Sequence, residues 1–484
     1  VNLFVTQRFI IAMAKKLNDK KELVILGAGP GGYTAAFLAA DKGLNVTVID
    51  PEENPGGVCL YRGCIPTKAL LYLSEVIRDA EEAGDMGVTF GKPDINHKKV
   101  NEWKIKVVKQ LTGGLGQLSK ARKIEHIRGR GKFISDEEIE ITPNDGKKQT
   151  ISFEKCIIAT GSSPVKLPMV EKFTDRIMNS AIALEVDDIP KHLLIVGGGY
   201  IGLEMGTIYS TLGAKISLVE ATDNYMPGMD KELIRHFKKG NKDLFEEEFF
   251  KTQLSALKEL KTGVKVTLKN EKEEFEKKYD KVLIAVGQMP NTKNIGLEEA
   301  GVETNEKGFI SIDDHLQTSK EKIYAIGDVT QGPLLAHRAS AQGRVAVEHI
   351  LEGKAAFDVR SIPAVVYTNP EIATCGMTEE ECKEKGIEYK VTKFPWSALG
   401  KAVSMNAPFG VTKLIIEKET ERVLGGGMVG KHAGDLIPEL TLAVEMAAVA
   451  SDLSLTIHPH PTLSESIMEA AEGFFGAATH FKGK

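Results

Sequence analysis

Short apolar runs alternate with helical patterns along most of the chain. Residues 23–26 (LVIL) and 45–50 (NVTVID) flank a helical stretch of small residues, 33–40 (YTAAFLAA). The same order returns where residues 193–196 (LLIV) and 215–220 (KISLVE) flank a second helical pattern. Strand, helix and strand in this order form the repeating unit of a parallel sheet with helices on its faces. We therefore expect an α/β fold that contains two Rossmann-like dinucleotide-binding domains.

The rest of the chain divides around these two units. Strand-like runs from residue 361 and an apolar helix at 435–450 predict a C-terminal α+β domain that serves dimerisation. A highly charged stretch, 223–250, is interpreted as a solvated helical face. At about 150 residues per domain, 484 residues allow roughly three domains. The expected division is an N-terminal extension (1–20), a first dinucleotide-binding domain in two parts (21–165 and 286–358), a second dinucleotide-binding domain (166–285) and the C-terminal domain (359–484).

Each βαβ unit begins its helix with a GxGxxG turn. The first glycine allows the tight turn, the second lets the backbone approach a pyrophosphate, and the third brings helix and strand close together. The helix N-terminus then offers unpaired N–H groups to the phosphates. An acid follows 23 residues after the first glycine in both units (50 − 27 and 220 − 197) and is placed to bind ribose hydroxyls. The predicted dinucleotide ligands are Gly27, Gly29, Gly32 and Asp50 in the first unit, and Gly197, Gly199, Gly202 and Glu220 in the second.

The acid of the second unit indicates which nicotinamide cofactor it takes. Glu220 would accept hydrogen bonds from a ribose 2′-hydroxyl and would repel a 2′-phosphate. Ala221 and Thr222 supply no arginine that could bind such a phosphate. The alternative is that Glu220 only ends a solvated strand. NAD is favoured over NADP.

Composition and charge exclude several classes of protein. Lys and Arg number 62 against 67 Asp and Glu, a net charge of −5, which gives no support for nucleic-acid binding. We find no run of about 18 apolar residues that could span a membrane. Five unevenly spaced cysteines suit a reducing compartment, and we expect the cytoplasm. Cys156 is expected in the core, and of Cys375 and Cys382 one is expected buried and the other at the surface.

Two cysteines, Cys59 and Cys64, lie five residues apart in the string GGVCLYRGCIPTK. Five residues of regular helix rise about 7.5 Å, which exceeds the roughly 4.4–6.8 Å between the Cα atoms of a disulfide. A bond between them therefore needs a distorted turn, for which Gly63 and Pro66 are suited, and strained disulfides are the easily reduced ones. The alternatives are two buried thiols, a structural disulfide or a zinc site, but a zinc site needs two more ligands and the sequence contains no partner CxxC. A redox-active pair without a metal is favoured.

The strings GAGPGGY and GGVCLYRGCIPTK together resemble the flavoprotein disulfide reductases, and the resemblance spans nearly the whole chain. It implies that the first unit binds FAD, that Cys64 faces the flavin, and that Lys68 pairs with Glu204 beside it. It also implies that Asp328, in TSKEKIYAIGD, binds the ribityl chain. Further cofactor-binding positions by this resemblance are Gly57, Gly131, Thr160, Gly161, Ala336 and His337 for FAD, and Gly287 at the close of the NAD domain.

The C-terminal string IHPHPTLSE resembles the base motif of the same family. Histidine is the side chain whose ordinary pKa suits proton transfer near neutral pH. By resemblance His460 is the base and Glu465 its partner, whereas His458 is not catalytic. Without the resemblance both histidines would be interpreted as ordinary turn residues or as two ligands of a metal site. In the family this pair reaches the cysteines of the other subunit, which implies a homodimer.

The resemblance implies oxidation of dihydrolipoamide on a separate lipoyl-bearing protein, of a 2-oxoacid dehydrogenase complex or the glycine cleavage system. The alternative is an NADPH-dependent reductase of a glutathione-like disulfide, against which Glu220 argues. Two departures from the family pattern are Tyr61-Arg62, where Asn-Val is common, and Gln288, where Arg is usual. Residues 1–12 are interpreted as an over-called start before Met13, with a targeting segment as the alternative.

Overall fold

The computed structural model describes residues 20–482, so the predicted N-terminal extension lies almost wholly outside the described residues. The chain forms two compact units. The first contains the described residues up to Pro66, with Glu102–Val165 and Gly287–Asp358; the second contains Thr67–Asn101, Lys166–Val286 and Val359–Lys484. None of the helices within residues 20–482 has the length and apolar character that a membrane span requires.

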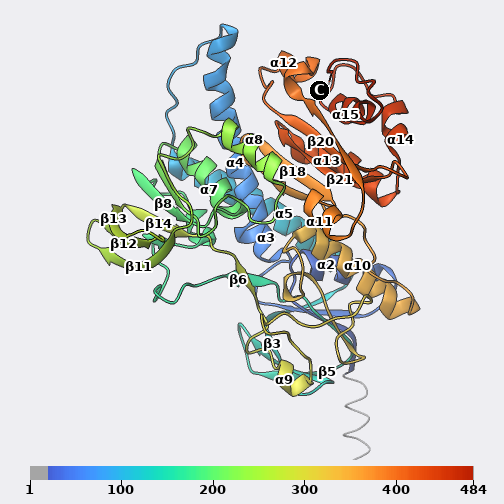
Figure 1. The fold of residues 1–484 in the computed structure, drawn as a ribbon. Helices are drawn as coiled ribbons and strands as arrows, with labels where there is room; N and C mark the ends of the chain where they lie inside the picture. The colour runs from blue at the N-terminus through green and yellow to red at the C-terminus, as the bar shows by residue number, and fades with distance from the viewer. Residues whose placement is uncertain (1–19, 483–484) are drawn as a thin grey trace, which may run out of the picture. The chain divides into compact units, whose positions relative to one another are not determined.

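The first unit is built on a sheet whose centre is parallel (Figure 1). β1 pairs with β2 on one side and with β5 on the other, as the LVIL and NVTVID runs predict. β3 first pairs with β2 in parallel and then, from Gly129 onward, with β4 in antiparallel register. The strands are β1 (Lys20–Leu26), β2 (Val46–Asp50), β3 (Glu125–Phe133), β4 (Glu138–Pro143), β5 (Gln149–Ile158) and β16 (Ile323–Ala325), with a separate pair β6 (Ser162–Pro164) and β15 (Gln288–Pro290).

Two helices of the first unit cross at very short distance. α2 (Pro30–Asp41) and α10 (Ala336–Glu352) pack through small residues. A Cβ on Gly343 would lie 2.6 Å from the carbonyl oxygen of Gly31, and one on Gly31 would lie 3.0 Å from that of Ala339. The small-residue pattern of α2 is therefore required by this crossing. The other helices with residues in this unit are α3 (Gly57–Arg62), α4 (Cys64–Glu82, which continues into the second unit), α5 (His97–Ala121, which begins in the second unit), α9 (Leu297–Ala300) and the short η2 (Gly327–Val329).

The second βαβ repeat forms a parallel five-stranded sheet in the second unit, in the order β10-β9-β8-β14-β7. β8 (His192–Val196), α7 (Tyr200–Thr211) and β9 (Lys215–Val219) are the predicted strand, helix and strand. The predicted charged face is α8 (Lys231–Gly240), which buries Leu233, Ile234 and Phe237. The remaining elements are η1 (Ala83–Met86), β7 (Ile177–Met178), α6 (Ser180–Ala183), β10 (Glu247–Phe249) and β14 (Lys281–Ile284), with an antiparallel sheet of β11 (Gln253–Leu260), β12 (Gly263–Lys269) and β13 (Glu274–Tyr279).

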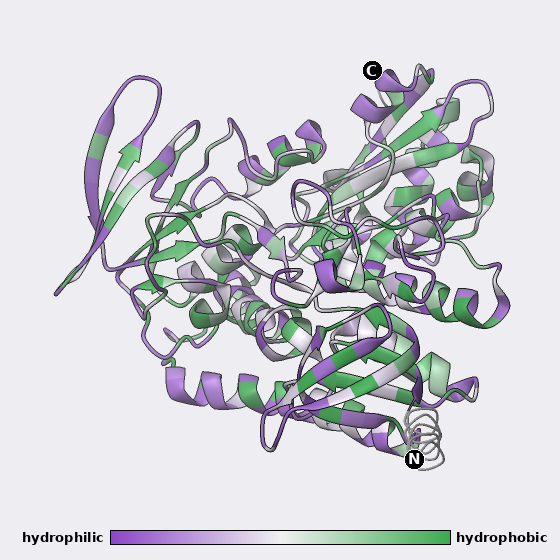
Figure 2. Cartoon of the chain, turned by 90° about the horizontal axis from the view of Figure 1, so that it is seen from below, coloured by the Kyte–Doolittle hydropathy of each residue, from purple (hydrophilic) through white to green (hydrophobic). Residues whose placement is uncertain are grey.

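Hydrophobic residues line the interiors of both units, and hydrophilic residues line the outer helix faces and the β11–β13 sheet (Figure 2). In β12 the side chains of Val264, Val266 and Leu268 are fully buried and alternate with exposed or half-buried positions. This period of two is typical of a sheet with one solvated face. It explains why a strongly charged segment of sequence still forms regular strands.

An antiparallel sheet of order β17-β18-β21-β20-β19 forms the C-terminal α+β part, as predicted. Cys156 and Cys375 are buried as expected, but the expectation of a surface thiol was wrong, because Cys382 in α11 is fully buried. The elements are β17 (Ala364–Val366), β18 (Glu371–Gly376), α11 (Glu379–Glu384), β19 (Tyr389–Pro395), η3 (Trp396–Ala398), α12 (Gly400–Ser404), β20 (Val411–Glu417), β21 (Val423–Gly430), α13 (Ala433–Glu445), α14 (Ala450–Leu455) and α15 (Glu465–Phe475).

Candidate active site

The first glycine turn joins β1 to α2 and has no room for side chains at two of its three glycines. Gly27 has φ +99°, and a Cβ there would lie 2.3 Å from the carbonyl oxygen of Ala159. A Cβ on Gly32 would lie 2.0 Å from the carbonyl oxygen of Gly27. Gly29, by contrast, has only the Gly57 Cα within reach, at 4.0 Å. The turn therefore leaves space where a pyrophosphate would approach its backbone.

The second turn, between β8 and α7, has nearly the same backbone geometry. Gly197 has φ +111°, and its Cβ would lie 2.4 Å from the carbonyl oxygen of Ala285. A Cβ on Gly202 would lie 2.1 Å from the carbonyl oxygen of Gly197. No atom lies within 4 Å of a Cβ built on Gly199. Both turns thus fit a bound dinucleotide phosphate, the second with more open space.

The two predicted acids brace their glycine turns in the same way. Asp50 accepts the N–H of Ala28 at 2.8 Å, and Glu220 accepts the N–H of Gly198 at 2.7 Å. Each also accepts the N–H two residues further along, Glu52 at 2.9 Å and Thr222 at 2.8 Å. Burial raises the pKa of Asp50, and these two N–H groups oppose the rise.

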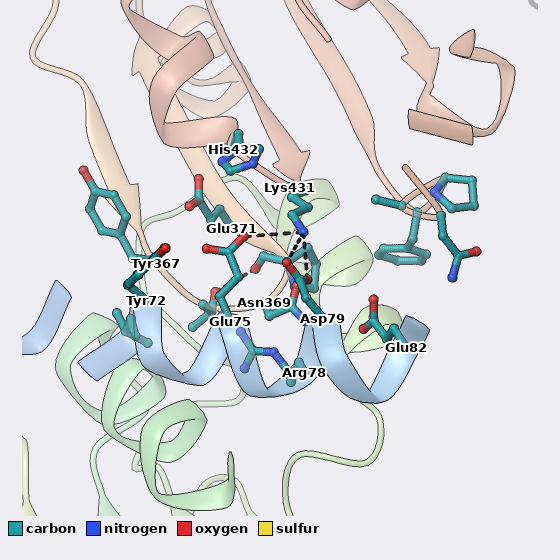
Figure 3. A pocket seen from close by; sticks show the side chains of 18 of the residues that line it. Tyr72, Glu75, Arg78, Asp79, Glu82, Tyr367, Asn369, Glu371, Lys431 and His432 are labelled. Carbon is teal, nitrogen blue, oxygen red and sulfur yellow. Dashed lines mark hydrogen bonds and ion pairs between the residues drawn. The ribbon is translucent and has the colours of Figure 1, made fainter. Parts of the chain in front are cut away.

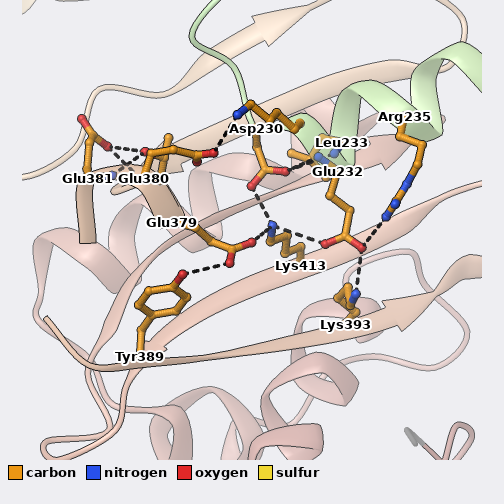
Figure 4. A network of polar contacts seen from close by, with 12 residues as sticks. Asp230, Glu232, Leu233, Arg235, Glu379, Glu380, Glu381, Tyr389, Lys393 and Lys413 are labelled. Atoms are coloured by element: carbon orange, nitrogen blue, oxygen red, sulfur yellow. Dashed lines mark hydrogen bonds and ion pairs between the residues drawn. The ribbon is translucent and has the colours of Figure 1, made fainter. Parts of the chain in front are cut away.

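A long-range ion cluster supports the second turn (Figure 4). The N–H of Met226 donates to the carbonyl oxygen of Gly198 (3.0 Å), and the same loop ends at Asp230, the N-cap of α8. Asp230 binds Lys413 of β20 at 2.7 Å, and the Lys413 side chain is only 1% exposed. The other two carboxylates around this ammonium belong to Glu232 and Glu379. The position of the turn therefore depends on a buried charge 183 residues away in the chain from Asp230.

The predicted break between Cys59 and Cys64 is confirmed. α3 ends at Arg62, α4 begins at Cys64, and Gly63 separates them, where a Cβ would lie 3.0 Å from the carbonyl oxygen of Val58. Pro66 does not contribute to the break: it lies in the first turn of α4, where a missing N–H costs no intrahelical bond. Cys59 is half-buried and Cys64 is exposed.

The helix that carries Cys59 begins against the first glycine turn. Gly57, at the start of α3, has φ +58°, and a Cβ there would lie 2.5 Å from the Cα of Gly29. Burial raises the pKa of the Tyr33 phenol in α2, and the charges of Cys59 and Cys64 add to the rise. At the second turn Tyr200, the first residue of α7, is exposed. The helix that carries Cys59 thus begins at the first dinucleotide turn.

The predicted pair of Lys68 and Glu204 is present. Lys68 Nζ lies 3.0 and 2.9 Å from the two carboxylate oxygens of Glu204, which is buried. The backbone N–H of Tyr367 also donates to Glu204 (3.1 Å), and the Lys68 ammonium lies 4.3 Å from the centre of the Tyr367 ring. Lys68 is four residues after Cys64 in α4. The ammonium is therefore fixed in position by a buried carboxylate and an aromatic face.

Asn291, which the sequence analysis did not single out, holds the predicted turn at Thr160 and Gly161. The Thr160 hydroxyl donates to the carbonyl oxygen of Asn291 (2.8 Å), and the Asn291 side-chain amide donates to that of Thr160 (3.0 Å). The N–H of Asn291 donates to the carbonyl oxygen of Gly161 at 2.9 Å. The string IAVGQMPN contains Asn291, but its partners lie about 130 residues earlier, so the pattern gave no signal for this contact.

Asp328 lies in η2 and carries a hydrogen bond that the sequence could not reveal. The hydroxyl of Ser162 donates to it at 2.6 Å. Burial raises the pKa of Asp328, and Ser162 and the nearby Arg338 oppose the rise. Gln342, fully buried in α10, accepts the N–H of Gly327 at 2.7 Å and fixes this turn. Ala336 is the first residue of α10, and His337, next to it, is exposed.

Two predicted glycines have a local reason for being glycine. A Cβ on Gly131 in β3 would lie 2.7 Å from a Leu26 methyl group and 3.1 Å from one of Ile139, so packing alone excludes a side chain. Gly287 has φ +118° and begins the returning part of the first unit. Adenine contact at Gly131 and NAD contact at Gly287 stay predictions.

The two histidines of the C-terminal motif differ sharply in environment. His460 Nδ1 lies 2.9 Å from Glu465, and its side chain is 73% exposed. His458 is only 4% exposed and is bonded to Glu439 (2.7 Å) and to the carbonyl oxygen of Thr456 (2.8 Å). Only His460 has a ring that is both oriented by a carboxylate and accessible to a reactant.

Glu465 is held in its charged form. Burial alone would raise its pKa, but the N–H of Thr462, which donates to it at 2.7 Å, and the contact with His460 outweigh burial and lower it. An ionised carboxylate fixes the orientation of the imidazole and stabilises its protonated form. The pair can therefore take a proton from a thiol that approaches Nε2.

A cavity of about 460 Å³ lies in the second unit with Lys68 among its lining residues (Figure 3). Lys431, which lines the cavity, forms ion pairs with Asp79 (2.8 Å) and Glu75 (3.5 Å) of α4. Burial raises the pKa of Glu371 to about 7, and the charges of Asp435 and Glu75 add to the rise. The N–H of Gly434 donates to this carboxylate at 2.8 Å. Within the described residues no group of His, Cys, Asp and Glu could hold a metal ion.

Comparison with known proteins identifies relatives over nearly the whole chain. Residues 21–343 match the family model described as pyridine nucleotide-disulphide oxidoreductase, and residues 362–471 match the dimerisation domain of that family. A dihydrolipoyl dehydrogenase of Vibrio parahaemolyticus is 44% identical over 473 residues, which cover 98% of this chain and 99% of the relative. One of Bacillus subtilis is 41% identical over 464 residues, 95% of this chain and 97% of the relative.

Solved structures of related flavoproteins superpose on nearly the whole chain. LpdA of Mycobacterium tuberculosis superposes with a TM-score of 0.87 at 27% sequence identity, covering 94% of this chain and 99% of that one. The HOCl-induced flavoprotein disulfide reductase RclA of Escherichia coli superposes with a TM-score of 0.83 at 27% identity, covering 93% and 99%. The predicted fold class is confirmed by these matches.

Proposed function

Because the chain belongs to the pyridine nucleotide-disulphide oxidoreductase family, we propose that it oxidises protein-bound dihydrolipoamide to lipoamide and transfers the electron pair to NAD⁺. The observation that carries this proposal is the contact of Gly57 with Gly29, because it places the start of α3, the helix that carries Cys59, at the first dinucleotide turn. The relatives named dihydrolipoyl dehydrogenase support the choice of substrate. The sparse cysteines further favour a reducing compartment, the cytoplasm.

The two glycine turns are assigned to different cofactors. The first, with Asp50, would bind FAD, and the second, with Glu220, would bind NAD. Bound FAD would supply the centre that accepts the electron pair from Cys64 and yields hydride to NAD⁺. Lys68, fixed by Glu204, would place a positive charge beside that centre. Asp328, Thr160 and Gly161 would line the first site with polar groups.

The thiol chemistry belongs to the cysteines and to His460. His460 of the partner subunit takes a proton from one thiol of the substrate, and the resulting thiolate attacks Cys59. The Cys59–Cys64 bond breaks, and Cys64 leaves as a thiolate. The second substrate sulfur then attacks the first while its proton passes to the leaving Cys59 sulfur, which closes the lipoamide disulfide and releases Cys59 as a thiol. When the electron pair has passed to NAD⁺, the Cys59–Cys64 disulfide has re-formed, and one proton is released in each turnover.

A homodimer completes this site. His460 is exposed in its own chain, and exposed apolar side chains lie in the same region of the C-terminal part, among them Leu442, Met446, Leu455 and Ile457. Obligate protein–protein interfaces typically bury groups of exposed apolar side chains such as these. The match to a dimerisation domain over residues 362–471 supports the same assembly. The lipoyl group would arrive on a separate protein of a 2-oxoacid dehydrogenase complex or of the glycine cleavage system.

Replacing Cys64 by Ser tests the proposed function. The variant should retain FAD and NADH-to-dye activity but lose dihydrolipoamide oxidation by about a thousandfold or more, because no disulfide can form. Cys382→Ser, at a buried cysteine of the C-terminal part, is the matched control and should keep both activities. Wild-type enzyme should prefer dihydrolipoamide over reduced glutathione and NAD⁺ over NADP⁺. Undiminished lipoamide turnover in Cys64→Ser would refute the scheme.

A further inference from the structure

The four residues between the cysteines include Tyr61 and Arg62, and both are anchored to the loop that follows β2. The Tyr61 hydroxyl donates to the carbonyl oxygen of Asn54 at 3.0 Å and accepts the N–H of the same residue at 3.3 Å. Arg62 forms an ion pair with Glu52, with Nη2 to Oε1 at 2.5 Å. These are the two positions at which the chain departs from the Asn-Val pair common in its family, and an Asn or Val side chain is too short to make the same contacts.

The loop that receives these anchors carries the acid of the first glycine turn. Asp50 ends β2, and its Oδ1 accepts the N–H of Glu52 while its Oδ2 accepts that of Ala28. Glu52 is therefore held at both ends, by its backbone N–H at Asp50 and by its carboxylate at Arg62. A change in the position of residues 51–54 would be transmitted directly to the acid that is expected to bind a ribose.

This loop also forms the wall of a cavity of about 330 Å³ in the first unit. Asn54 and Tyr61 lie on its lining together with two cationic side chains, Lys109 and Arg128. The wall is closely packed from behind, because a Cβ on Gly116 of α5 would lie 2.0 Å from the side-chain oxygen of Asn54. Glu52 and Glu53 also line the cavity, so its wall carries two carboxylates beside the two cations. Together with the neighbouring Asp50, these groups offer partners to the ribose hydroxyls and the phosphate groups at the adenosine end of a dinucleotide.

We propose that Tyr61 and Arg62 are positioning residues for FAD, which hold residues 51–54 closed beside the adenosine end of the first dinucleotide site and thereby slow the release of the cofactor. The redox segment then has a second role besides electron transfer: it fastens the site that holds the flavin. This role rests on the assignment of the first glycine turn to FAD. At the second turn the corresponding support comes from the loop at Met226 and Asp230, and no atom lies within 4 Å of a Cβ built on Gly199.

The rate of FAD release from the holoenzyme tests this role. The enzyme is diluted into buffer without flavin, and the fluorescence of free FAD is followed with time. Tyr61→Phe removes only the hydroxyl, and Glu52→Gln removes only the charge that Arg62 binds. Each should release FAD about three- to tenfold faster than wild type, as expected for the loss of one partly exposed polar contact. Tyr61→Asn/Arg62→Val, which restores the family pair, should release FAD faster than either single variant.

Conservative rescue separates positioning from a general loss of stability. Arg62→Lys keeps a cation for Glu52 and should retain slow release, whereas Arg62→Val should not. Asp41→Asn breaks a comparable surface ion pair, Arg122–Asp41 (2.9 Å), in the same unit and is the matched control. It should leave the rate of FAD release unchanged. Equal release from wild type, Tyr61→Phe and Glu52→Gln would overturn the proposal.

Asp50→Asn distinguishes a failure of this proposal from a failure of the FAD assignment. If FAD occupies the first turn, Asp50→Asn accelerates its release whatever Tyr61 and Arg62 do. Fast release from Asp50→Asn with unchanged release from the Tyr61 and Glu52 variants would refute the fastening alone. Unchanged release from all of them would refute the assignment of the first turn to FAD and the fastening with it.

Discussion

The two dinucleotide turns of this chain have nearly the same backbone but different surroundings. In both, the first glycine has a positive φ, the third has no room for a Cβ, and an acid accepts the N–H that follows the first glycine. The first turn is covered by the chain itself, since Gly57 and the cysteine segment lie against Gly29. The second is open at Gly199 and Tyr200. A covered turn suits a cofactor that stays bound, and an open one suits a cosubstrate that must enter and leave in each cycle.

The two turns are also supported over different ranges of sequence. Asp50, Glu52 and Asn54, with Tyr61 and Arg62, support the first within about a dozen residues. The second depends on a loop that ends at Asp230 and is tied to Lys413 in the C-terminal sheet. Local support makes the first turn independent of the C-terminal part. Long-range support makes the geometry of the second turn sensitive to that part.

The largest effect is expected at the base that serves only dithiol chemistry. His460→Gln should lower the rate of dihydrolipoamide oxidation by about 10²- to 10⁴-fold, the usual contribution of a general base. NADH-to-dye activity, which uses both turns but no thiol proton transfer, should be kept. Steady-state assays of both reactions measure the difference. His458→Gln is the matched control and should lose less than about threefold, and an equal loss in both variants would contradict the assignment of the base.

The next largest effect should follow from breaking the long-range support of the second turn. Lys413→Met leaves three carboxylates facing one another without their buried ammonium, so the free energy of unfolding should fall by about 3–5 kcal/mol. The KM for NAD⁺ should rise while FAD content is kept. Urea unfolding and steady-state kinetics measure the two effects.

An exposed lysine of the same region provides the comparison for Lys413. Lys418 pairs with Glu388 at 3.3 Å, and both side chains are exposed. Lys418→Met should change the free energy of unfolding by less than about 1 kcal/mol. A rise in KM for NAD⁺ in Lys418→Met equal to that in Lys413→Met would show that the second turn does not depend on the buried cluster.

Glu220→Gln should weaken the binding of NAD⁺ and reduce the discrimination against NADP⁺. The amide keeps an oxygen for the N–H of Gly198 but loses the charge that repels a 2′-phosphate. A rise of about tenfold in KM for NAD⁺ and a smaller ratio of KM for NADP⁺ to KM for NAD⁺ are expected, from steady-state kinetics. FAD content should not change. A variant that lost flavin instead would place FAD at the second turn.

The smallest expected effect is a pH dependence of the free energy of unfolding, which arises at Glu371 and not at either glycine turn. The pKa of Glu371 is raised from its ordinary 4.5 to about 7 in the folded chain, so its carboxyl contributes stability below about pH 4.5 and loses it as the pH rises through 7. Glu371→Gln does not titrate. Between pH 5 and pH 8 the free energy of unfolding of the variant, measured in urea, should therefore rise relative to that of wild type by on the order of 1–2 kcal/mol, allowing for solvent screening. Parallel pH profiles for the two proteins would contradict this.

Local rules predicted the parts of the site that lie close together in sequence. A positive φ at Gly27 and Gly197 and the brace by an acid follow from a βαβ unit of about thirty residues. His460 and Glu465 are five residues apart, and the break at Gly63 follows from helix geometry. In each case the chain itself keeps the partners within reach.

Contacts between distant segments could not be predicted from local patterns, and the one that was predicted, Lys68 with Glu204, came from the family resemblance. Asn291 lies 131 residues from Thr160, Ser162 lies 166 residues from Asp328, and Lys413 lies 183 residues from Asp230. No periodicity relates such positions, and only the folded chain shows which polar residues meet. The prediction that one of Cys375 and Cys382 is exposed was wrong for a similar reason. The helix of Cys382 has three acidic residues in its first turn, which is typical of a solvated helix, but Cys382 itself is fully buried.

The central claim, that like turns hold unlike cofactors, is tested most directly by alanine at the two middle glycines. Gly29 (φ −68°) and Gly199 (φ −78°) both have a backbone that alanine adopts, and neither has an atom closer than 4.0 Å to the added Cβ. Any effect therefore arises where a bound phosphate would lie. Flavin content and KM for NAD⁺ are measured in Gly29→Ala and Gly199→Ala. We predict that Gly29→Ala folds but is purified with little FAD, while Gly199→Ala keeps its FAD and binds NAD⁺ weakly; the reverse pattern would contradict the account.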